Sequence, residues 1–162
     1  MAAEGIVLVT GGSRGIGAAT ATLLAGQDHR VVVTDIAPEP LAGTQVILWP
    51  APFDVASESA VVSGIADIES AHGPITGLVN AAGIFGKMNP IERVRMEQWD
   101  REVDIDLRGT FLVARSVGVK MAERRHGATS ARIDQPRAAG LHRSHPSQIH
   151  RSYSPSRTAR HG

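Results

Sequence analysis

Up to about residue 126, the chain alternates between two hydrophobic patterns. Short runs rich in Val and Ile, typical of buried strands, are separated by stretches in which apolar residues recur at steps of three and four. The strand-like runs are Gly5–Thr10, Arg30–Asp35, Gln45–Trp49 and Ile75–Ala81. This alternation predicts an α/β fold in which helices cover both faces of a parallel sheet.

Two helices have clear sequence signals. Between the third and fourth strands, Ser57 is placed as an N-cap, Gly73-Pro74 as a stop, and the apolar positions between them are Val61, Val62, Ile65 and Ile68. A long helix is predicted around Trp99–Ala114, with one apolar stripe formed by Trp99, Val103, Leu107, Phe111, Ala114 and Val117. We interpret this stripe as core that also offers a partner surface.

The pattern stops after His126. Residues 127–162 contain six Arg, four His, six Ser and three Pro but a single acid, Asp134, which gives them a net charge of +5 within a chain total of +1. Such a segment buries too little apolar surface to offset its ordering entropy. We therefore predict a folded part, 1–126, and a basic tail, 127–162, that is disordered or produced by a frameshift near Gly127. Translation of the coding DNA in its other two frames tests the frameshift.

Composition suits one soluble domain, because 42% of the 162 residues are hydrophobic. No apolar run is long enough to span a bilayer, and the N-terminal residues do not resemble a signal peptide. The absence of cysteine excludes disulfides and thiolate metal ligands. We expect a cytoplasmic protein without a membrane segment or a metal site.

The segment from Thr10 to Gly17, Thr-Gly-Gly-Ser-Arg-Gly-Ile-Gly, follows the first strand directly and opens a helix. Gly11 suits the tight turn, Gly15 the approach of a pyrophosphate to the backbone, and Gly17 close helix packing. The helix start would direct unpaired backbone N–H groups at the phosphates. The alternative is a glycine-rich turn that only joins a strand to a helix.

Asp35 lies eighteen positions after Gly17, at the end of the second strand. A carboxylate there accepts hydrogen bonds from the ribose hydroxyls of a dinucleotide and repels a 2′-phosphate, which favours NAD over NADP. Arg14 is the residue that could oppose this preference, since it is close enough in the turn to meet a phosphate. The alternative is that Asp35 only caps a strand.

These residues resemble the short-chain dehydrogenase/reductase family, whose glycine motif is Thr-Gly-x-x-x-Gly-x-Gly. Asp54-Val55 matches the family's Asp-Val pair at the adenine ring, Asn80-Ala81-Ala82-Gly83 its Asn-Ala-Gly signature, and Trp99–Ala114 its long helix beside the active site. Taken singly, Asp54 is also a plausible turn residue before a helix, and Asn80–Gly83 an ordinary strand end. The predicted cofactor-binding residues are Gly11, Ser13, Arg14, Gly15, Ile16, Gly17, Asp35, Asp54, Val55, Asn80, Ala81 and Gly83.

The resemblance implies a Rossmann-like doubly wound sheet and an NAD(P)-dependent oxidoreductase that acts on a small alcohol or carbonyl and assembles as a homo-oligomer through the long helix. Such a sheet has about six strands, of which we recognise four. The stretch Thr129–Asp134 does not have the pattern of the fifth, so we expect an unpaired edge on the fourth strand. The alternatives are a non-catalytic dinucleotide-binding fragment and, less favoured because the tail lacks interleaved aromatics, a polyanion-binding or nucleic-acid-binding protein.

The catalytic set that the family implies is a Ser followed by Tyr-x-x-x-Lys, in which the lysine lowers the pKa of the tyrosine from about 10. The only tyrosine is Tyr153, which Arg157 follows at the lysine spacing, whereas Lys87 and Lys120 both precede it. Because Arg stays charged and cannot relay protons, we interpret the Tyr153 match as coincidence. Asp106 stands where the family carries an active-site Asn; it cannot donate as an amide does, and the alternative is a solvated helix residue.

We therefore predict no measurable NAD-linked turnover of simple alcohols, ketones or sugars by the 162-residue chain. A chain carrying the family's usual continuation after His126 should be active in the same spectrophotometric assay. Ketone reduction that Tyr153→Phe abolishes would contradict this prediction.

Overall fold

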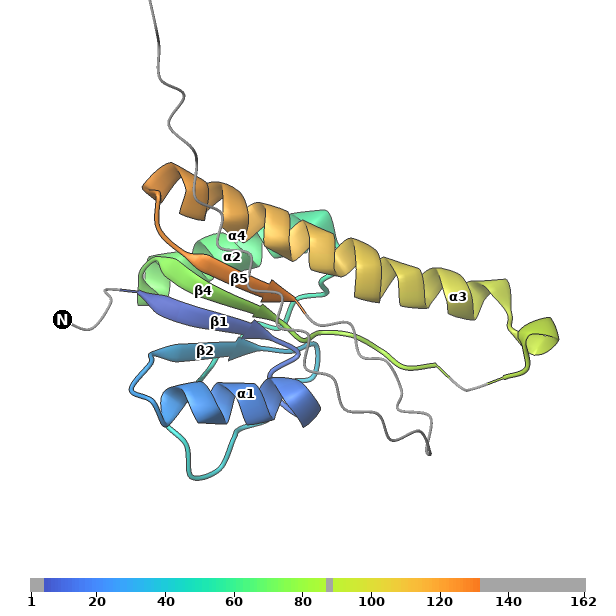
Figure 1. Ribbon diagram of the computed structural model, residues 1–162, viewed down its shortest axis with the longest axis horizontal. Helices are drawn as coiled ribbons and strands as arrows, with labels where there is room; N and C mark the ends of the chain where they lie inside the picture. Colours follow the sequence, from blue (N-terminus) through green and yellow to red (C-terminus); the bar gives the residue numbers. More distant parts are fainter. Residues whose placement is uncertain (1–4, 87–88, 132–162) are drawn as a thin grey trace, which may run out of the picture.

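The computed structural model describes residues 5–86 and 89–131 and arranges them as one parallel sheet between two layers of helices (Figure 1). The α/β fold class predicted from the alternating patterns is confirmed. The elements are β1 (Ile6–Thr10), α1 (Gly15–Ala25), β2 (Val31–Thr34), β3 (Ile47–Leu48), α2 (Glu58–His72), β4 (Ile75–Asn80), η1 (Ile91–Arg93), α3 (Met96–Glu102), η2 (Val103–Gly109), α4 (Thr110–Arg124) and β5 (Ala128–Ala131).

The strand order is β3-β2-β1-β4-β5, and every pair is parallel. The chain leaves β1 toward β2 on one side and later returns to place β4 on the other. β1 is therefore the point at which the winding direction of the sheet reverses, where open α/β sheets form a crevice at the carboxyl ends of their strands.

Each face of the sheet has its own apolar core. On the side of α2 and α4, residues of the strands pack against both helices, and the fully buried members are Ile6, Leu8, Val32, Val61, Ile65, Ile68, Ile75, Leu78, Val113 and Val117. On the side of α1, the buried residues are Val9, Ala21, Val31 and Val33. Consecutive residues of β2 thus face opposite cores, which explains its uninterrupted apolar run.

A fifth strand is present, so the expectation of four strands and an unpaired β4 is wrong. β5 pairs with β4 from Gly77↔Ala128 to Asn80↔Ala131. Its residues Thr129 and Ser130 are exposed, so this strand is formed by backbone pairing and has no apolar pattern by which to recognise it. It lies inside the segment 127–162 for which no regular structure was expected; residues 132–162 lie outside the described part.

The long helix is longer than predicted and divides its apolar residues between two faces. It runs without a break from Met96 to Arg124 through the π-helical segment η2. The buried residues of α4 are Leu112, Val113, Val117 and Met121, whereas Trp99, Leu107 and Phe111 are at least 55% exposed. The prediction of a single buried stripe is therefore wrong in part. A π turn holds an extra residue, so a count at steps of three and four loses its phase across η2.

The predicted boundaries of α2 are confirmed, while other details differ. The Ser57 side chain accepts a hydrogen bond from the Ala60 backbone N–H, and Gly73 follows the helix with a φ of 90°. Val62, expected on the apolar face, is 53% exposed. The third strand, expected over Gln45–Trp49, pairs only through two residues, Ile47 and Leu48.

Glu69 ties α2 to α4 and to the start of β4. Its carboxylate accepts hydrogen bonds from Lys120 Nζ at 2.8 Å and from the Ile75 backbone N–H at 3.0 Å, and it pairs with Arg124 Nη2 at 3.0 Å. Arg124 also donates to the Ile75 carbonyl. Burial is the largest single effect and raises the pKa of Glu69, but these hydrogen bonds and the charge of Lys120 together hold that pKa below its ordinary value.

Replacing Glu69 with Gln should lower the free energy of unfolding at pH 7 by about 1–3 kcal/mol, because charged hydrogen bonds are lost. An unfolded-chain glutamate has a pKa of about 4.3. The folded-state pKa is lower. The carboxylate therefore stabilises the fold fully above the unfolded-chain pKa of about 4.3 and loses its effect as the pH falls through the folded-state pKa.

Urea unfolding from pH 7 to pH 3 should therefore show the two proteins converging in acid. The matched control is Glu58→Gln, which removes the exposed Arg115–Glu58 ion pair and should cost less than about 1 kcal/mol at pH 7. If the stability difference between the unaltered chain and Glu69→Gln stayed constant from pH 7 to pH 3, the stabilising role of the ionised Glu69 carboxylate would be contradicted.

Candidate functional site

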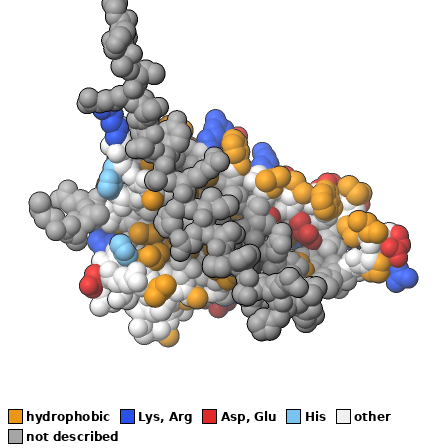
Figure 2. Space-filling view, in the orientation of Figure 1, with side chains coloured by type: hydrophobic (Ala, Val, Ile, Leu, Met, Phe, Trp, Pro, Cys, Tyr) orange, Lys and Arg blue, Asp and Glu red, His pale blue; other side chains and the backbone are white. Residues whose placement is uncertain are grey.

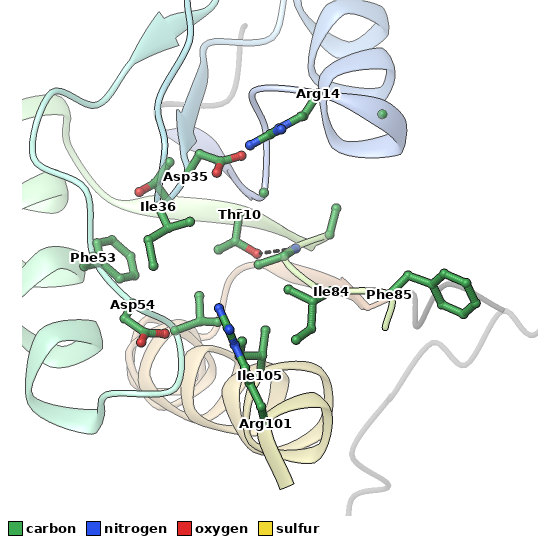
Figure 3. A pocket seen from close by; sticks show the side chains of 17 residues that line it. Thr10, Arg14, Asp35, Ile36, Phe53, Asp54, Ile84, Phe85, Arg101 and Ile105 are labelled. Carbon is green, nitrogen blue, oxygen red and sulfur yellow. Dashed lines mark hydrogen bonds between the residues drawn. The ribbon is translucent and has the colours of Figure 1, made fainter. Parts of the chain in front are cut away.

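A cavity of about 560 Å³ opens where the carboxyl ends of β1, β2 and β4 meet (Figure 3). Its walls come from the glycine turn, the ends of these strands, the loop before α2, the loop after β4, and the helix formed by α3 and η2. The lining residues are Thr10, Gly11, Arg14, Gly15, Thr34, Asp35, Ile36, Phe53, Asp54, Val55, Ala81, Ala82, Gly83, Ile84, Phe85, Arg101 and Ile105.

Two glycines of the turn allow backbone contacts that no side chain would permit. Gly11 has a φ of +62°, and a Cβ there would lie 2.6 Å from Ala82 Cα. A Cβ at Gly17 would overlap the Gly11 carbonyl oxygen. The turn is therefore pressed between the start of α1 and the end of β4, as the glycine spacing predicts.

The start of α1 presents backbone donors beside the cavity. The helix has 11 residues, and its N-cap, Arg14, makes no side-chain cap hydrogen bond. The first backbone N–H groups of a helix have no partner within the helix, and the helix dipole favours an anion there. Together with Gly11 and Gly15, which line the cavity, this end of α1 is suited to a phosphate group.

Asp35 follows β2 and lines the cavity beside the turn. Its carboxylate accepts hydrogen bonds from the backbone N–H groups of Ser13 and Ala37, both at 3.2 Å. Arg14 points its guanidinium toward this carboxylate (Figure 3). Both residues line the part of the cavity where the sequence analysis expected a preference between cofactors.

Asp54 is the turn residue of the alternative interpretation, and it also lies in the wall of the cavity. It lines the cavity, and its Oδ1 accepts from the Ala56 backbone N–H at 2.9 Å in the turn that leads to α2. The neighbouring Val55 also lines the cavity and is buried. Ile36, Phe53 and Ile105 add apolar walls nearby.

Asn80 lies under the site and not in its wall. The side chain is buried, accepts from the Thr10 hydroxyl at 3.3 Å and donates to the Thr110 carbonyl at 3.4 Å. The Thr10 hydroxyl accepts in turn from the Ala82 backbone N–H at 3.3 Å. Asn80 therefore fixes the ends of β1 and β4 and the start of α4 relative to one another.

The remaining predicted site residues divide into three groups. Ala81 and Gly83 line the cavity, whereas Ser13, Ile16 and Gly17 do not. The Ser13 hydroxyl instead accepts from the Glu39 backbone N–H at 2.9 Å. Tyr153 and its neighbour Arg157, like Lys87, lie outside the described residues.

Asp106 is not the solvated helix residue of the alternative interpretation. It lies in η2, is half-buried, and accepts from the Ile84 backbone N–H at 2.8 Å. Ile84 lines the cavity but Asp106 does not. The carboxylate therefore holds the loop after β4 against the long helix.

Several lining residues were missed by the sequence analysis. Arg101 reaches from α3 toward the cavity (Figure 3) and has no hydrogen-bond or ion-pair partner among the residues described. Thr34, at the end of β2, could have been found as the cross-strand partner of Thr10.

Neither a membrane span nor a metal centre is found within residues 5–86 and 89–131. No helix there is long and apolar enough to cross a bilayer. No three His, Cys, Asp or Glu side chains come together in that part as a possible metal-binding group.

Comparison with known proteins shows which family has this sequence and this fold. The short chain dehydrogenase family profile matches residues 5–129. Levodione reductase of Leifsonia aquatica is 36% identical over 131 residues, covering 75% of this chain and 49% of that protein. Acetoacetyl-CoA reductase of Shinella zoogloeoides is 38% identical over 134 residues, covering 75% of this chain and 52% of that protein. A crystal structure of levodione reductase has a TM-score of 0.71 at 31% identity, covering 79% of this chain and 53% of that one.

The chain spans about half the length of the curated relatives it matches. The family match begins at the residue before β1 and extends into β5, so it includes the glycine turn, the reversal at β1 and the cavity. Sequence motif, strand order and similarity to solved structures agree, and the chain belongs to the short-chain dehydrogenase/reductase family.

Proposed function

We propose that this chain binds NAD or NADP in the cavity and forms the cofactor-binding part of an oxidoreductase that acts on a small alcohol or carbonyl. The observation that carries the proposal is the convergence of the glycine turn, the uncapped start of α1 and Asp35 at the reversal point of the sheet. Membership of the family supports the reaction class, and two of the relatives are named as reductases.

The described residues fit the chemistry of a dinucleotide. The pyrophosphate would meet the backbone N–H groups at Gly15 and the following turn of α1, and the adenosine ribose would meet Asp35. The adenine ring would lie near Asp54 and Val55. The remaining part, which supplies hydride transfer when bound, would extend past Ala81 and Gly83.

The proposed preference is for NAD. The fixed carboxylate of Asp35, held by two backbone N–H groups, opposes a 2′-phosphate by charge repulsion. Arg14, whose guanidinium is directed toward Asp35 in Figure 3, acts in the opposite direction because it would attract a 2′-phosphate. The proposed preference therefore rests on the fixed position of the Asp35 carboxylate in the cavity wall.

A second candidate is a dinucleotide-binding chain without catalysis. It is favoured by Asp106, which accepts the Ile84 N–H and lies outside the cavity wall, where the family's Asn is replaced by an acceptor-only group. We propose Asp106 as a positioning residue for the loop after β4. A catalytic role for Tyr153 is the weaker proposal, because Arg157 stands at the lysine spacing.

Calorimetric titration should show that the unaltered chain binds NAD more tightly than NADP. Asp35→Asn should narrow the difference about tenfold, which corresponds to about 1.4 kcal/mol, because a negative charge near the 2′-phosphate is removed while an oxygen remains for the Ser13 N–H. Asp28→Asn, at an exposed position outside the cavity wall, is the control and should change neither affinity. Equal affinities in the unaltered chain would refute the preference, and binding of neither cofactor would refute the proposed function.

For the whole protein we propose a homo-oligomer in the cytoplasm that associates through the long helix. Large apolar side chains remain exposed on this helix, namely Met96, Trp99, Leu107, Phe111 and Val119, each by 54–63%. Figure 2 shows hydrophobic side chains at the surface where Figure 1 places α3. Exposed apolar patches of this kind mark interaction surfaces.

Sedimentation velocity should therefore show an oligomer that Phe111→Glu dissociates, because the substitution places a charge in the apolar contact. Leu23→Glu is the matched control, since Leu23 is 63% exposed on α1, and it should leave the assembly intact. A monomeric unaltered chain, or equal effects of the two substitutions, would exclude this surface as the interface.

A further inference from the structure

Two threonines occupy equivalent positions at the carboxyl ends of adjacent strands. Thr10 of β1 and Thr34 of β2 are register partners. Both are almost completely buried, with exposed fractions of 0% and 2%, and both line the cavity. They therefore form neighbouring parts of its floor.

Their hydroxyls differ in one respect. The Thr10 hydroxyl donates to Asn80 and accepts from the Ala82 backbone N–H. Thr34 Oγ1 has no hydrogen-bond partner among the residues that the structure describes. A buried hydroxyl without a partner destabilises a protein, and valine, which has nearly the same shape, would avoid that cost.

The position of Thr34 in the cavity wall indicates where a partner for its hydroxyl could lie. Trp49 Nε1 also lacks a partner in the described part of the chain, but Trp49 does not line the cavity, whereas Thr34 does. Thr34 precedes Asp35 directly, and Ile36, Phe53 and Asp54 line the same cavity. If the phosphates lie at the start of α1, this is the region that receives the nucleoside next to them.

We propose that Thr34 is a nucleoside-positioning residue, whose hydroxyl hydrogen-bonds an oxygen or ring nitrogen of the adenosine part of the bound dinucleotide. The bond is direct or passes through one ordered water, since a hydroxyl can serve as both donor and acceptor. This inference rests on the proposed function. It adds a polar contact from the floor of the cavity to those expected from Asp35 and Asp54.

The test compares three variants, Thr34→Val, Thr34→Ser and Thr10→Val, by calorimetry and by thermal unfolding of the ligand-free chain. The probes are NAD, ADP-ribose, AMP and nicotinamide mononucleotide. Thr34→Val should weaken the binding of NAD, ADP-ribose and AMP by a common factor of about five to ten, and leave nicotinamide mononucleotide unchanged. Thr34→Ser, which keeps the hydroxyl, should retain the affinity for AMP.

Thermal unfolding separates this role from a structural one. Without ligand, Thr34→Val should melt at or above the temperature of the unaltered chain, because it removes an unpartnered hydroxyl. Thr10→Val should melt lower, because Asn80 and the Ala82 N–H each lose a partner.

Unchanged AMP and NAD affinity in Thr34→Val would overturn the inference and leave the proposed function intact. A loss of ligand-free stability as large as that of Thr10→Val would also overturn it, since the hydroxyl would then have a structural partner. Failure of the unaltered chain to bind any of the adenosine probes would overturn the proposed function together with this inference.

Discussion

Parallel pairing of β1 with both β2 and β4 is the constraint on which the candidate site depends. The pairing brings Thr10, Thr34 and Asn80 to one level across three strands, so three polar side chains meet where the strands end. The chain must then leave β1 between two neighbours. Glycine is required at two points of this path, because a Cβ at Gly11 would lie against Ala82 and a Cβ at Gly17 against Gly11.

The polar layer beneath the cavity connects the site to the rest of the fold. Asn80 bonds to Thr10 and to the Thr110 carbonyl, so the end of the central strand, its neighbour and the start of α4 are fixed together. Asp106 extends this arrangement by holding Ile84. The walls of the cavity are thus positioned by hydrogen bonds from Asn80 and Asp106. Neither of these side chains lines the cavity.

Features set by local chemistry could be predicted from the sequence. The glycine turn, the Ser57 cap and the apolar runs of β1, β2 and β4 each carry their own signal, and each is present. β5 was missed because its four residues, Ala-Thr-Ser-Ala, form a strand only through the edge of β4. The long helix was assigned one apolar face because a π turn leaves no mark in the spacing. Arg101 and Thr34 depend on which strand ends and helix turns face one cavity, and this follows from topology.

The continuous helix from α3 to α4 has consequences for cooperativity. Leu112, Val113, Val117 and Met121 anchor α4 in the core, whereas α3 buries no residue and is joined to α4 through the π segment. Backbone amides with little buried apolar support exchange with solvent through local opening, and those in a core helix exchange mainly when the whole domain unfolds. We therefore expect the two halves of one helix to open in different cooperative units, and covering the exposed face of α3 to slow the exchange of its amides with solvent.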